Sequence, residues 1–469
     1  MLTEALLREL KITGLSDDSR RVQAGDLFFA FPAPAFETYA KTALEKGALA
    51  VVSENSVPAG VDASRWIQVP DIREARLAAA KWFFKNPFAG LKVHGVTGTN
   101  GKTTISFLMA AMLSAAGRKT ALLGTICKRI GDSFVESSLT TPGLLELYAF
   151  ARKASDAGCS DLVMEVSSHA LDQARVAGVS FDSALFTNLT QDHLDYHGTM
   201  EAYFEAKKLL FTRYLSAEGL AVIHVGNAYG RKLFDEITAR KVSVATSGKA
   251  DFVPEFVKDT ADGFSMKVAR VSETPFDVSL HGSFNVENAL TVLAWANELY
   301  LSETAVRDVF RTIQVPGRFQ MVWNQDSRRV VVDYAHTPDA LERVLATARE
   351  ICSGKLAVVF GCGGDRDKTK RPLMGAVAEK LADEVWVTSD NPRTEDPEAI
   401  IRDILSGMHS RKFRVEPNRE NAIALTCRNL GSGDLLVVAG KGHENYQIIG
   451  TEKHHFDDRE IVLREMKKC

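Results

Sequence analysis

Apolar and polar positions alternate along most of the chain in the patterns of strands and helices. Short segments rich in apolar residues at 91–96, 161–166, 184–189 and 220–225 are typical of strands buried in a parallel sheet. Between the first two runs, residues 104–116 repeat apolar side chains at helical spacing. This alternation predicts a parallel sheet wrapped by helices.

The first 87 residues form a separate block with shorter patterns. An amphipathic helix is predicted at 1–10, followed by short apolar runs at 27–31 and 48–52. The block ends at Asn86-Pro87, a turn-forming pair. These signals predict a small α/β domain.

A third block begins after the break at Val315-Pro316-Gly317. Here we predict a helix at 340–351 and strands at 330–334, 356–360, 384–387 and 435–438. The pattern again predicts a doubly wound sheet. A length of 469 residues suits about three domains of roughly 150 residues each. We therefore predict an α/β protein with a small N-terminal domain (1–87), a central parallel-sheet ATPase domain (88–315) and a C-terminal Rossmann-like domain (316–469).

Composition adds little to this picture and excludes several classes of protein. The chain is 45% hydrophobic and 25% charged, with a net charge of −3, which is typical of a soluble globular protein. Basic residues are interspersed with acidic ones, so we expect no nucleic-acid partner. The sequence shows no signal peptide and no apolar run of membrane-spanning length. Its six cysteines form no CxxC pair. We expect a cytoplasmic monomer with free thiols and no membrane contact.

Residues 96–104 read Val-Thr-Gly-Thr-Asn-Gly-Lys-Thr-Thr and lie between a predicted strand and a predicted helix. In this context the segment predicts a nucleotide phosphate loop, whose glycines let backbone N–H groups close on a polyphosphate. Lys102 would neutralise phosphates and the Thr103 hydroxyl would bind Mg²⁺. Val96 stands where the strict motif has glycine, so the loop is a variant. The predicted phosphate-binding residues are Gly98, Thr99, Asn100, Gly101, Lys102, Thr103 and Thr104.

Polar segments follow two other predicted strands of the central block. Residues 164–169 contain Glu165, which is placed to reach a metal at the carboxyl end of a strand. Residues 187–197 are dense in groups that coordinate Mg²⁺ or orient phosphates, a composition that a solvated loop also has. A predicted helix at 201–211 carries Lys207 and Lys208, and two such lysines alone are typical of a solvated face.

Together these segments resemble those of the Mur ligase family, whose members form amide bonds with ATP. The resemblance covers nearly the whole chain and rests on residues 97–103, 165–169, 188–195, 284–288, 317–319, 333–338, 361–372 and 390–393. It implies activation of a carboxylate as an acyl phosphate, followed by attack of an amine, in peptidoglycan precursor synthesis. Within the family, the last two segments and residues 440–444 are similar to those of members that add meso-2,6-diaminopimelate to UDP-N-acetylmuramoyl-L-alanyl-D-glutamate.

The resemblance also implies residue roles. It assigns catalysis to Lys102, Glu165, His193 and Lys207, and Mg²⁺ binding to Thr103, Glu165, His193 and Lys207. It implies that Lys207 carries CO₂ as a carbamate. ATP would also contact Asn285, Asn288, Arg318, Asp333 and His336. Because Arg318 follows the Pro-Gly break, closure of the third domain would deliver its charge to ATP.

Two substrate sites follow from the same resemblance. The UDP-linked substrate would contact Ser19, Thr140, Thr141, Ser167, Gln173 and Arg175. The amino acid would contact Arg366, Asp390, Asn391, Pro392, Arg393, Gly440 and Glu444. Diaminopimelate differs from lysine chiefly by a second carboxylate, and the Arg393 guanidinium is a planar donor matched to it.

One segment departs from the family pattern, and several alternatives stay open. Residues 32–37 read Pro-Ala-Pro-Ala-Phe-Glu, where family members usually have a loop with glycine and histidine, so uridine contacts from this stiffer loop are in doubt. The alternatives are a lysine-adding member, a folylpolyglutamate synthase, a P-loop NTPase switch without amide product, and an inactive binding module. Segments 167–175 and 390–393 disfavour the synthase. The amino-acid site disfavours the switch, and the presence of Lys102, Thr103, Glu165 and His193 disfavours the inactive module.

Overall fold

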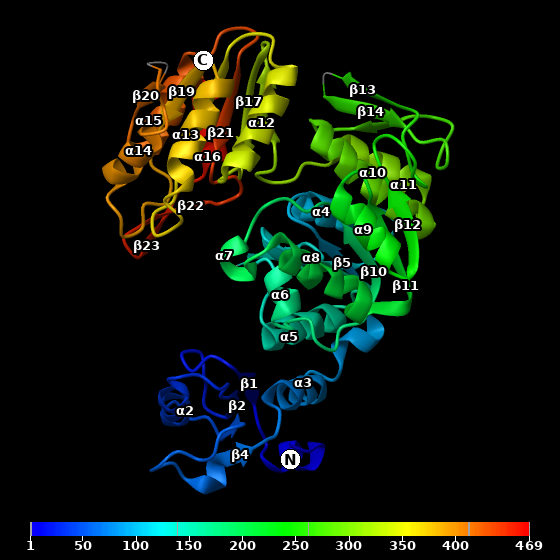
Figure 1. Cartoon of the computed structure of the whole chain (residues 1–469), viewed down its shortest axis with the longest axis vertical. Coiled ribbons are helices and arrows are strands. Elements are labelled where there is room, and N and C mark those ends of the chain that lie inside the picture. Colours follow the sequence, from blue (N-terminus) through cyan, green and yellow to red (C-terminus); the bar gives the residue numbers. More distant parts are fainter. Residues whose placement is uncertain (1, 138, 261, 411–412, 469) are drawn as a thin grey trace. The chain divides into compact units, whose positions relative to one another are not determined.

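The computed structural model describes residues 2–137, 139–260, 262–410 and 413–468 (Figure 1). By compactness the chain forms two units: Met1–Val253 with Leu290–Val306, and Pro254–Ala289 with Arg307–Cys469. The predicted domain boundaries at 87 and 315 do not coincide with these units and stay predictions. The predicted α/β class is confirmed, since the sheets are mainly parallel and alternate with helices.

The N-terminal part of the first unit holds a four-stranded parallel sheet in the order β1-β2-β3-β4. Its elements are α1 (Glu4–Glu9), β1 (Gly14–Ser16), β2 (Asp26–Phe29), α2 (Phe36–Glu45), β3 (Ala50–Ser53), η1 (Ala63–Arg65), β4 (Trp66–Gln68), α3 (Ile72–Phe83) and η2 (Pro87–Gly90). All residues of β2 and β3 are buried, as their apolar runs predict. The loop expected at 32–37 is shorter than predicted, because Phe36 and Glu37 form the first turn of α2.

The central sheet has eight strands in the order β12-β11-β10-β5-β9-β6-β7-β8, and only β7 runs opposite to the rest, because it is antiparallel to both β6 and β8. The strands are β5 (Lys92–Thr97), β6 (Thr120–Leu123), β7 (Cys127–Ile130), β8 (Ser133–Glu136), β9 (Asp161–Glu165), β10 (Phe181–Phe186), β11 (Leu215–His224) and β12 (Arg240–Val244). The helices are α4 (Lys102–Ala115), α5 (Leu144–Asp156), α6 (Ser168–Asp172), α7 (Leu194–His197), α8 (Met200–Leu209), the π-helix η3 (Leu210–Tyr214) and α9 (Ala228–Glu236).

Strand β10 begins and ends three residues before the apolar run that predicted it. Its first residues include the polar pair Asp182-Ser183, which hides the start of the strand in the sequence pattern. Beyond Phe186, Asn188 turns to the phosphate loop instead of continuing the strand, since its carbonyl accepts a hydrogen bond from the Thr99 N–H. The end of β10 is therefore set by the site it supports.

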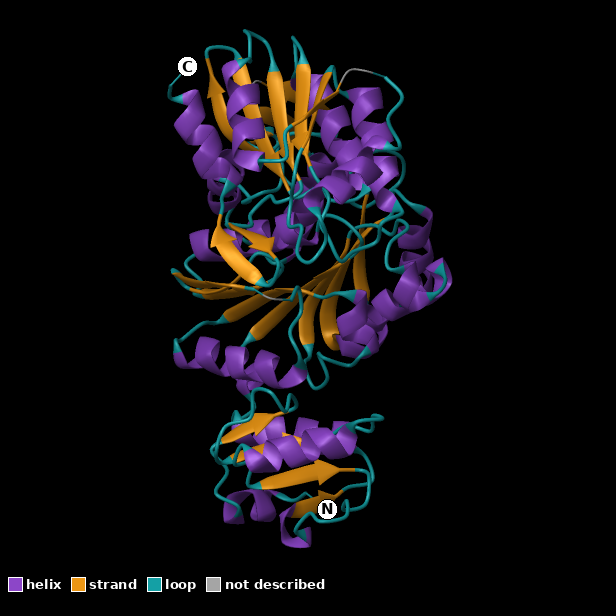
Figure 2. Ribbon diagram, turned by 90° about the vertical axis from the view of Figure 1, so that its left-hand side faces the viewer, coloured by secondary structure: helices purple, strands orange, loops and turns teal. Residues whose placement is uncertain are grey.

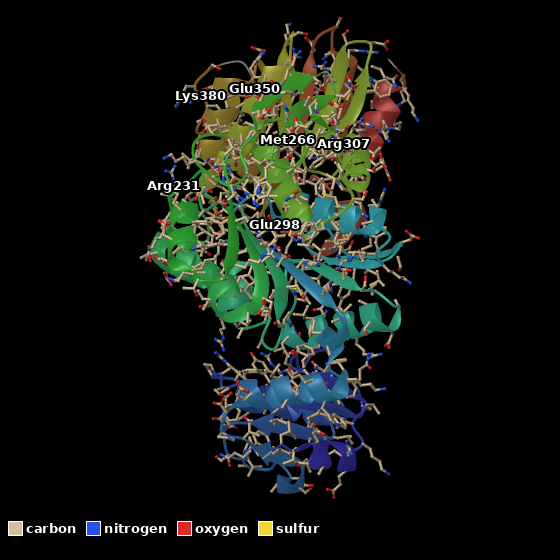
Figure 3. All side chains as sticks on the ribbon, turned by 90° about the vertical axis from the view of Figure 1, so that its right-hand side faces the viewer. Arg231, Met266, Glu298, Arg307, Glu350 and Lys380 are labelled. Atoms are coloured by element: carbon tan, nitrogen blue, oxygen red, sulfur yellow. The ribbon has the colours of Figure 1, made fainter. Side chains whose placement is uncertain are left out.

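The second unit begins with a small antiparallel sheet, β13 (Phe256–Thr260), β14 (Gly263–Lys267) and β15 (Phe276–Val278). Two helices follow in the chain, α10 (Ser283–Glu298) and α11 (Glu303–Thr312), and the part of them within Leu290–Val306 belongs to the first unit. The Arg307 guanidinium, labelled in Figure 3, lies 4.2 Å from the Phe276 ring centroid and donates a hydrogen bond to the Pro275 carbonyl. Arg307 lies in the middle of α11, so this contact joins that part of the helix to the start of β15.

The C-terminal sheet has six strands in the order β16-β17-β21-β18-β19-β20, all parallel except β16. Its elements are β16 (Gln320–Gln325), β17 (Arg328–Asp333), α12 (Pro338–Ile351), β18 (Leu356–Phe360), α13 (Lys370–Leu381), β19 (Glu384–Val387), α14 (Pro397–Leu405), β20 (Phe413–Val415), α15 (Arg419–Arg428), β21 (Leu435–Ala439) and α16 (Asp458–Met466), with a hairpin of β22 (Tyr446–Ile449) and β23 (Glu452–His455). Separate apolar clusters cover its two faces, and helices flank the sheet on both sides (Figure 2). The predicted doubly wound arrangement is confirmed.

In the described part of the chain, no helix combines the length and apolar character that crossing a membrane requires. Five of the six cysteines are described and are free thiols, and Cys469 lies outside the described residues.

Candidate active site

The loop after β5 has the backbone that a phosphate cradle needs. Gly98 has a φ of +147°, and a Cβ there would lie 1.8 Å from the Thr187 hydroxyl, so only glycine fits. Gly101 also has positive φ, and α4 begins directly after it at Lys102. The end of β10 holds the loop, since the Asn100 N–H donates to the Asn188 side chain at 3.0 Å. The predicted strand, loop and helix are all present, and the first N–H groups of α4 suit an anion.

Two lysines converge on one carbonyl oxygen of this loop. The Lys102 ammonium donates to the Gly98 carbonyl at 2.9 Å and to the Thr99 carbonyl at 2.8 Å. The Lys207 ammonium donates to the same Gly98 oxygen at 2.8 Å and lies 4.6 Å from the Tyr203 ring centroid. Two cations at one oxygen create a strongly positive spot suited to a polyanion.

The two adjacent lysines of α8 have different environments. Lys208 lies toward solvent and pairs with Glu205 at 2.8 Å and Glu236 at 2.9 Å. Lys207 is only 1% exposed, so the expectation of a solvated face is wrong for this residue. Burial, reinforced by the charge of Lys102 and opposed by Asp192, holds the pKa of Lys207 well below its ordinary value.

Glu165 ends β9 beside the phosphate loop and is fully buried. Its carboxylate accepts hydrogen bonds from the Thr103 hydroxyl at 3.1 Å, the Thr125 N–H at 2.8 Å and the Thr125 hydroxyl at 3.0 Å. Thr103 and Glu165, predicted together, are thus in contact. Thr125 was not predicted, although it lies just after β6, the parallel neighbour of β9.

His193 caps α7 with a φ of +54° and lies 3.5 Å from the Asp192 carboxylate. Its ring centroid is 4.9 Å from that of His169 and 6.0 Å from that of Tyr203. Burial and the nearby charges of Lys102 and Lys207 lower its pKa, against the opposing charge of Asp192. The described residues contain no group of three His, Cys, Asp or Glu side chains that could hold a metal. Glu165 and the Thr103 hydroxyl still suit Mg²⁺, which commonly takes one carboxylate and completes its shell with water and substrate phosphates.

Five of the six residues predicted for the UDP-linked substrate form one hydrogen-bonded cluster around Glu165. The Thr141 hydroxyl donates to the Glu165 carbonyl at 2.8 Å and accepts from the Ser167 N–H. Arg175 donates to the Thr141 carbonyl at 3.0 Å and to the Gln173 side chain at 2.9 Å. Thr140 joins through the Thr125 hydroxyl at 3.0 Å. Ser19 lies between β1 and β2, and no hydrogen bond of the described residues joins it to this cluster.

In the second unit, the residues predicted for ATP form two small groups. The Asp333 carboxylate accepts from the backbone N–H groups of Phe319 and Ala335 at 2.6 and 2.7 Å, and burial raises its pKa. Arg318 lies 5.0 Å from the Tyr334 ring centroid. His336 hydrogen-bonds the Tyr334 carbonyl at 2.9 Å.

The second group lies on α10. The Asn288 side chain donates to the Asn285 side-chain oxygen at 3.0 Å, and both residues are buried. Asn285 in turn donates to the His281 carbonyl. Both asparagines are thus held in fixed rotamers near the start of α10.

The residues predicted for the amino acid lie on three loops of the second unit, which follow β18, β19 and β21. The Arg393 guanidinium donates to the Gly364 carbonyl at 2.7 Å. The Asn391 side chain donates to the Glu444 carboxylate at 2.9 Å. A Cβ at Gly440 would lie 2.5 Å from the Asp390 carboxylate, so residue 440 needs to be glycine for this approach. Asp390 and Arg393 thus lie on one loop, which Asn391 joins to Glu444, and Arg393 and the exposed Arg366 both lie near Gly363.

An unpredicted buried arginine holds the loops after β18 and β19 together. Arg371 is fully buried and forms a two-pronged pair with Glu395 at 2.9 and 3.0 Å. The Glu395 carboxylate also accepts from the Asp365 N–H, and the Thr394 hydroxyl donates to Asp365. Nothing in the local sequence distinguishes Arg371 from neighbouring surface arginines, because the partners that bury it come from another loop.

Comparisons with known proteins agree with this description. The model of the Mur ligase middle domain matches residues 96–296, and that of the Mur ligase glutamate ligase domain matches residues 317–442. Fold, phosphate loop and matching domains define an ATP-dependent ligase that forms an amide bond.

Several relatives match almost the entire chain. A UDP-N-acetylmuramoyl-L-alanyl-D-glutamate--2,6-diaminopimelate ligase from Geobacter metallireducens is 45% identical, over 98% of this chain and 95% of the relative. A ligase of the same name from Synechococcus elongatus is 46% identical, over 96% of this chain and 93% of the relative. The chain belongs to the Mur ligase family.

Solved structures share the fold. The structure of a UDP-N-acetylmuramoyl-L-alanyl-D-glutamate--2,6-diaminopimelate ligase has 36% identity and a TM-score of 0.69, covering 97% of this chain and 95% of that one. A MurF ligase from Thermotoga maritima in complex with ADP has 19% identity and a TM-score of 0.62, covering 98% of each chain, and shows the fold alone. Folylpolyglutamate synthase from Mycobacterium tuberculosis, at 20% identity and a TM-score of 0.63, likewise shares only the fold.

Proposed function

We propose that this enzyme adds meso-2,6-diaminopimelate to UDP-N-acetylmuramoyl-L-alanyl-D-glutamate with ATP, in cytoplasmic peptidoglycan precursor synthesis. The observation that carries the proposal is the loop of residues 390–393, which supplies the Arg393 guanidinium and, through Asn391, is hydrogen-bonded to the Glu444 carboxylate. Diaminopimelate has an ammonium and a carboxylate at each end, so a site of both signs matches it. The names of the full-length relatives support the same substrate.

The phosphate loop and its lysines serve the first chemical step. A substrate carboxylate has to approach the γ-phosphate of ATP, and the two anions repel each other. Lys102 and the N–H groups that begin α4 hold the phosphates and lower that repulsion. The D-glutamate carboxylate then attacks the γ-phosphorus, which gives an acyl phosphate and ADP.

Thr103 and Glu165 would hold Mg²⁺, with His193 and Lys207 near a second ion. The ions would neutralise phosphate charge when bound. Lys207 as it stands is a cation and cannot be a metal ligand. Burial lowers the pKa of Lys207, so its ammonium gives up a proton more readily than that of an exposed lysine, and the deprotonated amine is the form that attacks CO₂ to give a carbamate. Intact-protein mass measured under native conditions tests this: the mass of one added CO₂ that is lost in the Lys207→Met variant supports it, and an active preparation without the added mass contradicts it.

The second step is attack by the amine of the incoming amino acid on the acyl phosphate. It forms a tetrahedral intermediate that expels phosphate, and the new amide bond remains. The cluster of Thr140, Thr141, Ser167, Gln173 and Arg175 would hold the UDP-linked substrate, where polar groups and one guanidinium suit a diphosphate. Ser19 would contact the uridine side. Arg318, Asp333, His336, Asn285 and Asn288 would serve the nucleotide. We expect the enzyme to act as a monomer.

The choice of amino acid is testable at Arg393. Lysine lacks the distal carboxylate, so it would leave the guanidinium without that partner. We expect Arg393→Ala to raise the KM for diaminopimelate about 100-fold, because a charged hydrogen-bonded pair is lost. Arg402→Ala, which removes an exposed guanidinium of α14, is the control.

The assay contains ATP, Mg²⁺, the UDP-linked dipeptide and either diaminopimelate or lysine, and the product is identified by mass. Tripeptide formed with diaminopimelate and much less with lysine supports the proposal. Equal use of both amino acids would favour a lysine-tolerant member. ATP hydrolysis without dependence on either substrate would indicate an NTPase switch.

A further inference from the structure

Lys441 is a fully buried cation beside the residues proposed to bind the amino acid. Its side chain has no exposed surface. Its ammonium donates to the Asn391 side-chain oxygen at 3.1 Å and to the Glu444 carboxylate at 3.4 Å. Asn391 also donates to Glu444, which closes a ring of three side chains. The ring joins the loop after β19 to the loop after β21.

Both hydrogen bonds to the Glu444 carboxylate end on the same oxygen, Oε2. None of the hydrogen bonds among the described residues reaches Oε1. The carboxylate is thus fixed by one oxygen, and the other remains for a ligand ammonium. The backbone around it is also held, because the Ile448 N–H donates to Asn391 and the Gln447 side chain donates to the Asp390 carbonyl.

The environment of Lys441 makes its ammonium hard to replace. The rings of Tyr446 and Phe456 lie 5.6 and 6.0 Å from the nitrogen, so the cation is enclosed by aromatic and polar groups. Burial raises the pKa of Glu444, and the charge of Asp390 raises it further, whereas Lys441 opposes both. Lys441 is the only cation among the three hydrogen-bonded side chains. Without it, the Glu444 carboxylate would lie near Asp390 with no cation among them to offset its charge.

We propose that Lys441 is a positioning residue for the amino-acid substrate: it fixes Asn391 and the Glu444 carboxylate so that one carboxylate oxygen faces the substrate's ammonium. Because Lys441 has no exposed surface, it acts through these two residues and does not touch the ligand. This inference rests on the proposed function. It goes beyond it by assigning a role to a residue that has no contact with any substrate.

A structural role alone would predict loss of stability without a specific change in kinetics. The KM for each of the three substrates, together with kcat, separates the two cases. We expect Lys441→Met to raise the KM for diaminopimelate at least about tenfold, since breaking a buried ion pair leaves its partner unsatisfied. The KM values for ATP and the UDP-linked dipeptide, and kcat, should change less than about threefold. The control is Lys453→Met. Lys453 is an exposed lysine whose ammonium lies 3.9 Å from the centroid of the Tyr446 ring, which also lies near Lys441.

A double-mutant cycle tests whether Lys441 acts through Glu444. If it does, Lys441→Met combined with Glu444→Gln should raise the KM for diaminopimelate no further than Glu444→Gln alone, within about twofold. If the rise in KM of the double variant were the product of the rises in the two single variants, the proposal would be overturned. An unchanged KM for diaminopimelate in Lys441→Met would also overturn it. Should that single variant fail to fold, the double variant, which removes both charges together, still gives the decisive comparison. A wild-type enzyme without tripeptide product would refute the proposed function, whereas an active wild type with an unaltered Lys441→Met variant would refute only this inference.

Discussion

The same three strands, β5, β9 and β10, carry polar groups at both ends of the central sheet, and the two ends are built differently. At the amino end, the His94 ring lies 3.0 Å from the Asp161 carboxylate and 2.8 Å from the Ser183 hydroxyl. Arg118 also pairs with Asp161, and Trp295 donates to Ser183. Every member has a partner, and Ser183, His94 and Asp161 are at most 1% exposed.

At the carboxyl end the charges are not balanced in this way. The ammonium groups of Lys102 and Lys207 both donate to the Gly98 carbonyl, which is a dipole and not an anion. A Ser-His-Asp set at the amino end has the residue types of a hydrolase, but its burial leaves no room for a substrate. The comparison teaches that residue types alone do not mark a site. Two lysine side chains that converge on a backbone cradle do, because such a cradle suits a polyanionic ligand.

Of the substitutions that distinguish the two ends of the central sheet, Lys207→Met is expected to change the activity most. We predict that Lys207→Met lowers the rate of tripeptide formation by about 100- to 1000-fold, because a group beside the transferred phosphate is lost. The free energy of unfolding should not fall, since burying an ammonium is costly and methionine fills similar space. Lys208→Met, in the half-buried neighbour that pairs with Glu205 and Glu236, is the matched control. Equal losses of activity in both variants would contradict the distinction.

At the amino end the opposite result is expected. Asp161→Asn should lower the free energy of unfolding by about 3 kcal/mol, because Arg118 and His94 lose a buried partner. Folded protein at 25 °C should keep its activity. Urea titration followed by fluorescence measures the free energy of unfolding, and the ligation assay measures the activity. A variant as stable as the wild type, or an inactive one that is fully folded, would show that the network has another role.

The same network predicts a dependence on pH. Burial alone would raise the pKa of Asp161, but hydrogen bonds from His94 and Ser160 and the charge of Arg118 bring it below its ordinary value of 3.8. The folded state therefore binds the proton more weakly than the unfolded state. This contribution to stability is present above pH 3.8 and is lost as the pH falls through the lower folded value. Asp161→Asn should remove this acid-dependent part of the unfolding free energy.

The sequence predicted the fold well because apolar periodicity reports burial directly. The runs at 356–360 and 384–387 match β18 and β19, since both faces of these strands are covered. Motif residues such as Gly98 and Lys102 were also predictable, because a loop between a strand and a helix has few other uses. Lys207 and Lys208 could be told apart only through the resemblance, since one step along a helix changes burial without changing residue type.

Residues that act through contacts distant in sequence could not be predicted. Thr125, Arg371 and Lys441 lie 40, 24 and 50 residues from their partners Glu165, Glu395 and Asn391. No periodicity or spacing connects such pairs. Their roles depend on which loops meet at the end of a sheet, and that requires the register of the strands.

The smallest effect is expected at a second histidine of the central sheet, and it sharpens the comparison with His94. His224 ends β11 and is 3% exposed, yet neither ring nitrogen has a hydrogen-bond partner among the described residues. Burial lowers its pKa from 6.5 to about 4. The unfolded state therefore binds a proton that the folded state does not, so stability falls as the pH drops from 6.5 toward 4.

The loss in the free energy of unfolding, for one group with such a pKa shift, is on the order of 3 kcal/mol at pH 4 and near zero at pH 7.5. We predict that His224→Asn removes part of this loss. Urea unfolding of the wild type and the variant at both pH values measures it. His454→Asn, in the half-exposed histidine of β23, is the control and should leave the pH dependence unchanged. If the free energy of unfolding changed equally with pH in the wild type and in His224→Asn, the buried imidazole would have a hydrogen-bond partner in solution. His224 would then resemble His94, whose ring nitrogens are both hydrogen-bonded in the core.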